Sequence, residues 1–191
     1  MSINLQKGQK VSLKKNVPTG LGEILVNLNW NSKQRKKGFL ASLLGSDSAI
    51  DLDLGCLYEL KNGQKGAVQA LGNAFGSLDK PPFVSLDGDD RTGDVAGGEN
   101  LRINGNKISE IKRVLVYTFI YEGVVNWKDA DAVVTIKYPK AEDIVVKMDD
   151  FNSSDTMCAL ALFENINDET FSVEKLIQFY RGHESLDRAF N

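Results

Sequence analysis

The residues best suited to chemistry in this sequence lie close together, between positions 87 and 100. Residues 87–99 contain five carboxylates and four glycines but a single arginine, Arg91. Such a segment cannot build a hydrophobic core, and an ordered loop of this composition brings several negative charges close to one another. Two outcomes are open. The loop stays solvated and mobile, or a hard cation such as Ca²⁺ holds it through carboxylate, carbonyl and amide oxygens.

A second acidic pair stands in residues 50–60, where apolar side chains recur at every other position. This alternation predicts a strand with Leu52 and Leu54 on one face. Asp51 and Asp53 then share the opposite face, about 7 Å apart. They are either part of an ordinary solvated face or, if the acidic loop lies nearby, further ligands for the same ion.

The acidic loop does not follow the spacing of an EF-hand. Counted from Asp87, position 5 is Arg91, position 6 is Thr92 and position 12 is Gly98, whereas an EF-hand requires an oxygen ligand, glycine and glutamate there. The glycines instead allow positive φ angles that turn backbone carbonyls toward an ion. Because Mg²⁺ demands a stricter octahedron, an oxygen-rich and pliable loop favours Ca²⁺.

Catalytic chemistry has few candidates in this sequence. The only histidine, His183, follows Gly182 near the C-terminus, and we interpret it as structural. Cys56 and Cys158 lie in apolar runs, which predicts reduced core thiols. No G-x-x-x-x-G-K-[ST] motif is present, and paired acids of a glycosidase would need an aromatic-lined cleft that the pattern does not indicate. We therefore expect no enzymatic activity.

The composition indicates one ordinary globular domain over residues 1–191. Hydrophobic residues make up 42% and charged residues 26%, the net charge is −3, and the pI is about 5.3. This charge gives no sign of nucleic-acid binding. No secretory h-region and no run of about 18 apolar residues is present, so we expect a soluble, cytoplasmic protein.

About nine or ten short strands separated by turn residues predict a mainly β fold, a two-sheet antiparallel β-sandwich. Residues 113–121 are β-branched and aromatic, which predicts a central strand buried on both faces. Residues 184–191 predict a short C-terminal helix, whereas the pattern of residues 170–180 leaves strand and helix open. Residues 38–45 form an apolar insertion that is either a lid on the core or a docking surface.

Several segments together resemble the tellurium-resistance stress-protein family, the TerD-type domain, and most closely its TerA-like branch. The resemblance spans nearly the whole chain. Its main carriers are Leu5-Gln-Lys-Gly8, Leu28-Asn-Trp30, Asp51-Leu-Asp53 and Gly88-Asp-Asp-Arg-Thr-Gly-Asp94, the last of which is similar to the family's Gly-Asp-Asn-x-Thr-Gly-Glu signature. The TerA-like character comes from Phe119-Ile-Tyr-Glu-Gly123, Asn126-Trp127, Tyr180-Arg-Gly-His-Glu184 and Asp187-Arg-Ala.

The resemblance implies a β-sandwich that binds Ca²⁺ at the acidic signature within a bacterial stress-response system that confers tellurite resistance. It also implies that residues 170–180 are a strand. The family pattern has aspartates where this chain has Ala96 and Gly98, which leaves one ion, weaker binding or a lost site open. The candidate ligands are Asp51, Asp53, Asp89, Asp90, Asp94 and Glu99, with a neutral oxygen from Thr92 or Gly93.

The function expected from these residues is a non-enzymatic, calcium-binding module of a tellurite-resistance system. Its expected partners are other stress-response proteins, with any contact to a membrane made indirectly through them. The alternative is a protein-interaction scaffold whose metal loop is degenerate and which docks partners through residues 38–45. The oligomeric state is left open.

Overall fold

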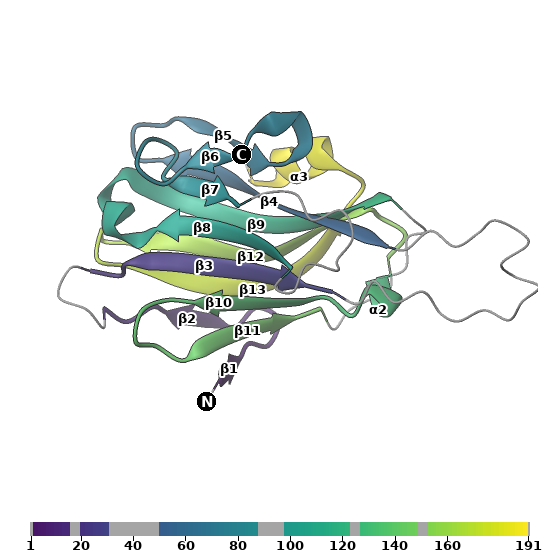
Figure 1. Ribbon diagram of the computed structural model, residues 1–191, viewed down its shortest axis with the longest axis horizontal. Coiled ribbons are helices and arrows are strands. Elements are labelled where there is room, and N and C mark those ends of the chain that lie inside the picture. The colour runs from purple at the N-terminus through teal and green to yellow at the C-terminus, as the bar shows by residue number, and fades with distance from the viewer. Residues whose placement is uncertain are drawn as a thin grey trace, which may run out of the picture.

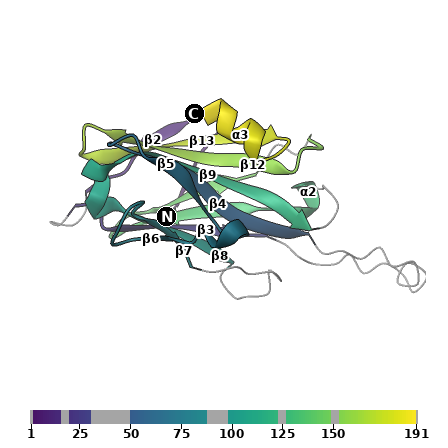
Figure 2. The same ribbon diagram turned by 90° about the horizontal axis from the view of Figure 1, so that it is seen from above.

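The computed structural model describes residues 2–15, 20–30, 50–87, 98–122, 127–148 and 153–190. These residues form two β-sheets that pack face to face, seen as two layers in Figure 2. The expectation of a mainly β, two-sheet sandwich with a short C-terminal helix is confirmed.

The first sheet has seven strands, and its middle strands line one side of the core (Figure 1). In spatial order they are β1 (Ser2–Asn4), β11 (Asp143–Lys147), β10 (Val133–Lys137), β3 (Glu23–Asn29), β8 (Glu99–Asn104), β7 (Val84–Leu86) and β6 (Gly76–Ser77).

The second sheet has six strands and includes the longest ones. In spatial order they are β2 (Lys10–Ser12), β13 (Thr170–Tyr180), β12 (Met157–Ile166), β9 (Ile111–Glu122), β4 (Asp51–Leu60) and β5 (Lys65–Gln69). Among the described residues, the helical elements are the 3₁₀ segments η1 (Leu71–Asn73) and η2 (Gly105–Glu110), and the α-helices α2 (Trp127–Ala130) and α3 (His183–Phe190).

The described strand pairs are antiparallel, as expected, with one exception. β1 runs parallel to β11, with Ser2 opposite Asp143 and Asn4 opposite Val145. These two strands are far apart in sequence, so no hairpin dictates their relative direction. After β1 the chain crosses to the other sheet and continues there as β2.

The core follows from the alternation of side chains along the strands. On β3, Ile24, Val26 and Leu28 point inward and are fully buried, while the residues between them are partly exposed. β9 is buried on both faces from Val114 to Ile120, as predicted for the central strand. One face of β9 meets the opposite sheet, and the other lies under α3 (Figure 2).

Residues 170–180 are a strand, and burial on both of its faces explains the helix-like pattern of the sequence. Ile177 points into the core between the sheets, whereas its neighbour Leu176 packs on the outer face together with Leu186 of α3. Apolar residues therefore follow one another at 176 and 177, and the strict alternation of apolar and polar residues is lost. β12 and β13 also lose register between Ala159 and Ala161, and Ile177 has a φ of 47°.

Candidate functional site

Three carboxylates are buried at one end of the sandwich, where β3 ends and β4 and β8 begin; we call this the acidic end. Asp51 is 9% exposed, Asp53 is 4% exposed and Glu99 is 2% exposed. The interpretation of the Asp51 and Asp53 pair as an ordinary solvated face is therefore wrong. Burying carboxylates is costly unless charge or hydrogen bonds compensate them, so each of the three needs local compensation.

Glu99 is held by a backbone amide of the opposite sheet. It begins β8 and points inward like Leu101 and Ile103. Its Oε2 accepts a hydrogen bond of 2.5 Å from the Leu54 N–H. That amide is accessible because β5 pairs with β4 only from Gly55 onward, so the first part of β4 has no strand partner on that side among the described residues. Glu99 thus links the acidic segment to the strand that carries Asp51 and Asp53.

Asp53 lies on the face of β4 opposite to Leu52 and Leu54, in register with Phe119 of β9. Thr118 Oγ1 donates a hydrogen bond of 2.9 Å to the Asp53 carbonyl oxygen, which fixes the backbone there. Burial, together with the neighbouring Cys56 and Asp53, raises the pKa of Tyr117. The phenol is therefore protonated at neutral pH, and Asp53 borders the aromatic layer beneath α3.

The two described ends of the acidic segment are pinned to the seven-stranded sheet. The Asp87 N–H donates to the Asn100 carbonyl oxygen at 3.0 Å, which extends the β7–β8 hairpin to its last described residue. Arg102 Nε lies 2.7 Å from Asp87 Oδ1, and its Nη2 lies 2.6 Å from Oδ2. Arg102 Nη1 also donates to Glu23. Both oxygens of Asp87 therefore accept hydrogen bonds from Arg102.

Gly98 closes the other end of the segment in a conformation that leaves no room for a side chain. Its φ is +62°, and a Cβ atom built there would lie 2.0 Å from the Leu28 carbonyl oxygen. Heavy atoms do not approach this closely, and positive φ disfavours side-chain-bearing residues. The glycine that stands where the family pattern has an aspartate is thus required by this backbone.

Trp30 joins the two ends of the insertion between β3 and β4. Its indole Nε1–H donates a hydrogen bond of 3.1 Å to the Ile50 carbonyl oxygen, and the ring is 6% exposed. The insertion itself, residues 31–49, lies outside the described residues, and so does the apolar stretch 38–45.

The remaining predicted ligands also lie outside the described residues: Asp89, Asp90, Thr92, Gly93 and Asp94. Within the described ranges, no group of three histidine, cysteine, aspartate or glutamate side chains is arranged to hold a metal ion. Asp51, Asp53 and Glu99 therefore do not by themselves form such a group. The donors that they supply are oxygens, which suits a hard cation and does not suit a thiophilic metal.

Sequence reasoning missed two contacts at the acidic end. It did not identify Arg102 as the partner of Asp87, although the two stand on neighbouring strands of one hairpin. It also counted Glu99 only as a ligand. The alternation of Glu99, Leu101 and Ile103 already indicated that the glutamate points into the sandwich.

The candidate catalytic groups are buried or packed against aromatic rings. Burial raises the pKa of the Cys56 thiol to about 12, and Cys158 is also buried and reduced, as predicted. His183 meets the rings of Tyr117 and Phe119 edge-on at centroid distances of 5.7 Å and 5.1 Å. Burial lowers the pKa of His183. A protonated, shielded thiol is a poor nucleophile, and this histidine serves packing.

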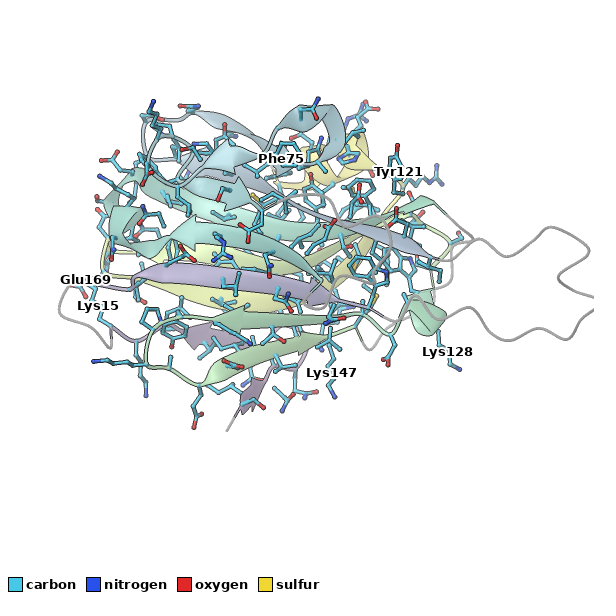
Figure 3. All side chains as sticks on the ribbon, viewed as in Figure 1. Lys15, Phe75, Tyr121, Lys128, Lys147 and Glu169 are labelled. Atoms are coloured by element: carbon cyan, nitrogen blue, oxygen red, sulfur yellow. The ribbon has the colours of Figure 1, made fainter. Side chains whose placement is uncertain are left out.

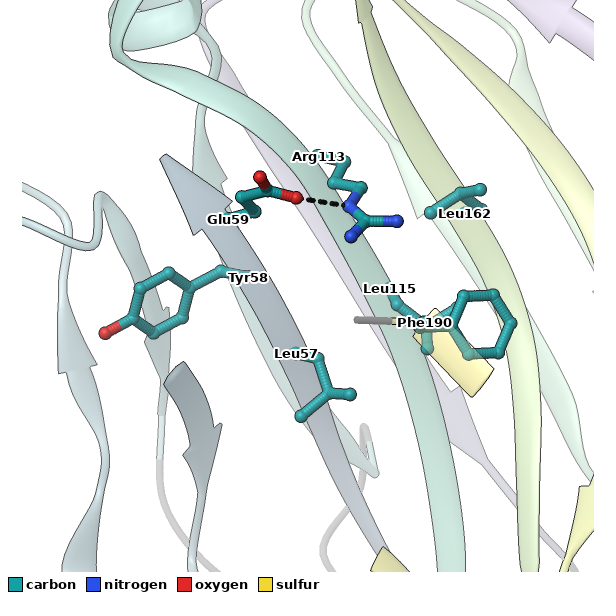
Figure 4. A pocket seen from close by; sticks show the side chains of 7 residues that line it. All are labelled: Leu57, Tyr58, Glu59, Arg113, Leu115, Leu162 and Phe190. Atoms are coloured by element: carbon teal, nitrogen blue, oxygen red, sulfur yellow. Dashed lines mark hydrogen bonds and ion pairs between the residues drawn. The ribbon is translucent and has the colours of Figure 1, made fainter. Parts of the chain in front are cut away.

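A shallow pocket lies on the outer face of the six-stranded sheet (Figure 4), at the far end of β4 from Asp51. It spans about 270 Å³ including open solvent, which is below the usual size of a small-molecule site. Leucines form its floor, Phe190 closes one side, and the Glu59–Arg113 ion pair at 2.7 Å closes the other. The pocket therefore has no part in the chemistry of the acidic end.

Figure 3 locates the acidic end by its labelled neighbours. Tyr121 of β9, Lys128 of α2 and Lys147 of β11 project on that side, whereas Lys15 and Glu169 lie on the opposite side. In the part of the chain that the structure describes, no helix is long and apolar enough to cross a membrane.

Comparisons with known sequences all point to the same protein family. The profile of the TerD domain matches residues 1–170. The tellurium resistance protein TerA of Alcaligenes sp. is 45% identical over 188 residues, which cover 95% of this chain and 55% of that protein. The tellurium resistance protein TerX of Serratia marcescens is 32% identical over 138 residues, 64% of each chain. The matched part of this chain thus spans only 55% to 64% of the length of these relatives.

Solved structures share the fold. A homologue of telluride resistance protein (TerD) from Streptomyces coelicolor A3(2) superposes with a TM-score of 0.60 at 17% identity, covering 87% of this chain and 95% of its own. A crystal structure of a protein of unknown function gives a TM-score of 0.59 at 16% identity, covering 85% of this chain and 92% of its own. At these identities the likeness establishes the fold alone.

Proposed function

The chain belongs to the TerD domain family, and from that premise we propose that it acts in tellurium resistance as a calcium-binding module without catalytic activity of its own. The observation that carries the proposal is the burial of Asp51, Asp53 and Glu99, the last of which follows Gly98 at one described end of the acidic segment and accepts a hydrogen bond from Leu54 of β4. Their carboxylates supply part of an oxygen donor set, and the segment between Asp87 and Gly98 supplies the rest.

The donor chemistry supports a hard divalent cation. Asp53 and Asp51 contribute carboxylates from a strand whose backbone is fixed on both sides, and residues 88–97 add Asp89, Asp90 and Asp94 with the neutral oxygens of Thr92 and Gly93. Ca²⁺ accepts six to eight such oxygens in irregular geometry. When bound, the ion would balance negative charge that the fold concentrates at this end.

We propose one ion. Asp87 is directed to Arg102, Glu99 Oε2 accepts from Leu54, and Gly98 has no room for a side chain. These three positions therefore add little to a second ion, and Asp89, Asp90 and Asp94 remain as the acids of the segment for the first.

The absence of catalytic activity is supported by the surroundings of the candidate groups. Cys56 carries a protonated, buried thiol, and His183 packs against two aromatic rings. We propose that resistance arises through binding of the ion and of other stress-response proteins, and that tellurium chemistry takes place outside the core thiols of this chain.

Calorimetric titration with Ca²⁺ tests the metal proposal. The parent should release heat with a stoichiometry near one ion, and Asp89→Ala and Asp53→Asn should each weaken binding by about tenfold or more, in the range typical of lost charged contacts. Arg113→Gln, which removes an ion pair at the other end of β4, is the matched control and should leave the affinity unchanged. A parent that gives no heat of binding rules the metal proposal out.

The second candidate function is a scaffold that docks partners through residues 38–45. The Trp30–Ile50 hydrogen bond favours the scaffold, because this bond holds together the two ends of the insertion whatever the residues between them do. Deleting residues 39–44 should then abolish co-purification with other stress-response proteins while the melting temperature stays near that of the parent. An unaltered set of partners argues against the scaffold.

A further inference from the structure

The shallow pocket on the outer face of the six-stranded sheet has an apolar floor that three strands share. Leu115 of β9 lies opposite Leu57 of β4 on one side and Leu162 of β12 on the other, so the three leucines form one row. Leu115 is buried, whereas Leu57 and Leu162 are half-buried beside it. The leucine row therefore leaves apolar surface at the bottom of a hollow that Phe190 of α3 borders (Figure 4).

The next row of the same face carries charges. Arg113, two residues before Leu115 on β9, lies opposite Glu59 of β4. Glu59 is 8% exposed, and each of its oxygens accepts one hydrogen bond: Oε1 from Lys112 Nζ at 2.8 Å and Oε2 from Arg113 Nε at 2.7 Å. Two cations thus serve one carboxylate, so this cluster has one positive charge in excess.

Arg113 keeps hydrogen-bonding capacity that the described part of the chain does not use. A guanidinium carries N–H donors on all three of its nitrogens. Among the described residues, only Nε of Arg113 has an acceptor, and the terminal nitrogens Nη1 and Nη2 have none. Figure 4 shows one of these terminal nitrogens directed toward Leu162. Glu164 lies opposite Arg113 on β12 but is paired with Lys10. The pocket therefore presents charged donors at the rim of an apolar floor.

We propose that this pocket docks an extended, acidic segment of a partner protein. The segment inserts one aliphatic side chain over the leucine row and places a carboxylate on the terminal nitrogens of Arg113, the group that binds carboxylates through paired N–H bonds. A hollow of about 270 Å³, open solvent included, suits a single side chain better than a whole small molecule. The excess positive charge selects an acid over a basic or neutral neighbour. This docking is independent of calcium binding.

The strand geometry also sets the spacing of the partner's two residues. Leu115 and Arg113 stand two positions apart on one strand, which is about 6.5–7 Å. An extended segment lying along β9 has the same repeat. The apolar residue and the acid of the partner are therefore two positions apart, with the side chain between them turned away from the sheet.

Three acetylated and amidated peptides, titrated into the full chain, test this pairing. The probe is Gly-Leu-Ser-Glu-Gly, and the controls are Gly-Leu-Ser-Gln-Gly, which lacks the charge, and Gly-Ser-Ser-Glu-Gly, which lacks the apolar side chain. The methyl signals of Leu57, Leu115 and Leu162 are followed by NMR. The probe should shift them saturably, and each control peptide should bind about tenfold more weakly, as expected for the loss of a charged hydrogen bond or of a buried aliphatic side chain.

Variants of the chain assign the two contacts. Arg113→Gln should bind the probe about tenfold more weakly and should no longer distinguish it from the glutamine peptide. Glu59 keeps its bond from Lys112 in this variant, so the fold should be retained, which the melting temperature checks. Phe190→Ala should weaken the two leucine peptides alike, because it removes apolar contact and leaves the cation. Arg188→Gln, which removes an exposed arginine of the nearby α3, is the matched control and should bind like the parent.

Three results would overturn the proposal. The first is a probe that leaves the three leucine signals unshifted at millimolar concentration. The second is equal binding of the probe by the parent and by Arg113→Gln. The third is a shift of the leucine signals that grows with protein concentration in the absence of peptide, together with a rising molecular mass in sedimentation, since a second copy of the chain is then the occupant.

Discussion

Replacing Gly98 by alanine probes the geometry of the acidic segment more sharply than removing any of its acids. The substituted Cβ would lie 2.0 Å from the Leu28 carbonyl oxygen and 3.1 Å from the carbonyl carbon, and the residue would keep a φ of +62°. The backbone of β3 cannot yield locally, since it pairs with β8 and β10 on its two sides. Gly98→Ala must therefore move the start of β8.

The expected loss of stability has two parts. Left-handed backbone costs a residue with a side chain about 1–2 kcal/mol. Forcing an extra methyl group against packed backbone costs about 1–3 kcal/mol more. The sum is about 2–5 kcal/mol, which lowers the melting temperature by roughly 4–20 °C for a chain of this size.

Gly72→Ala is the matched control for Gly98→Ala. Gly72 has a φ of +77°, but a Cβ there would have no atom within 4 Å, so only the conformational part applies. Thermal unfolding followed by circular dichroism should show a clearly larger drop for Gly98→Ala. Equal drops for the two variants would refute the reasoning, because the contact with Leu28 would then have no effect. Gly98→Asp should be destabilised at least as much, although it restores the acid of the family pattern.

Three further predictions concern neighbouring parts of the fold and the ion. Glu99→Ala leaves the buried Leu54 N–H without its acceptor and should cost about 1–3 kcal/mol in chemical denaturation, whereas Glu99→Gln keeps an acceptor and should cost less. Burial lowers the pKa of His183, so the unfolded chain binds a proton more readily than the folded chain, and the stability of the fold should decrease as the pH drops through about 6.5. Melting temperatures measured at several pH values across this range should show a smaller decrease for His183→Phe than for the parent. Ca²⁺ at about 100 times its Kd should stabilise the fold by about 2.7 kcal/mol, and a chelator should reverse the shift; an unchanged melting temperature would contradict binding to the native state.

The fold was largely predictable because its signals are local. Alternating apolar residues predicted β4, and β-branched and aromatic residues predicted β9. The strand identity of residues 170–180 was not readable from periodicity, because both faces of the strand are buried at Leu176 and Ile177 and two apolar residues therefore stand in succession. The family resemblance supplied what the pattern could not.

The candidate site was predictable in composition but not in the roles of its acids. The pair Asp51 and Asp53 was found from strand alternation, yet their burial depends on how the sheets stack, which no local pattern reports. The same limit applies to the engagement of Asp87 by Arg102 and of Glu99 by Leu54, since both contacts join different strands. Spacing reveals which acids are near one another in sequence, whereas the fold decides which of them already accept hydrogen bonds from other groups.

The parallel pairing of β1 with β11 shows the same limit for topology. The direction of this edge strand depends on a partner about 140 residues away. Long-range pairings of this kind carry no local turn signal.

A crystal structure of the protein grown with Ca²⁺ tests the central claim most directly. The account predicts a single ion at the acidic end, with oxygens of Asp53 and of Asp89 or Asp94 at about 2.3–2.6 Å from it and with Asp87 still bound to Arg102. Crystals saturated with Ca²⁺ that show no ion there, or show Asp87 among its ligands, would contradict it.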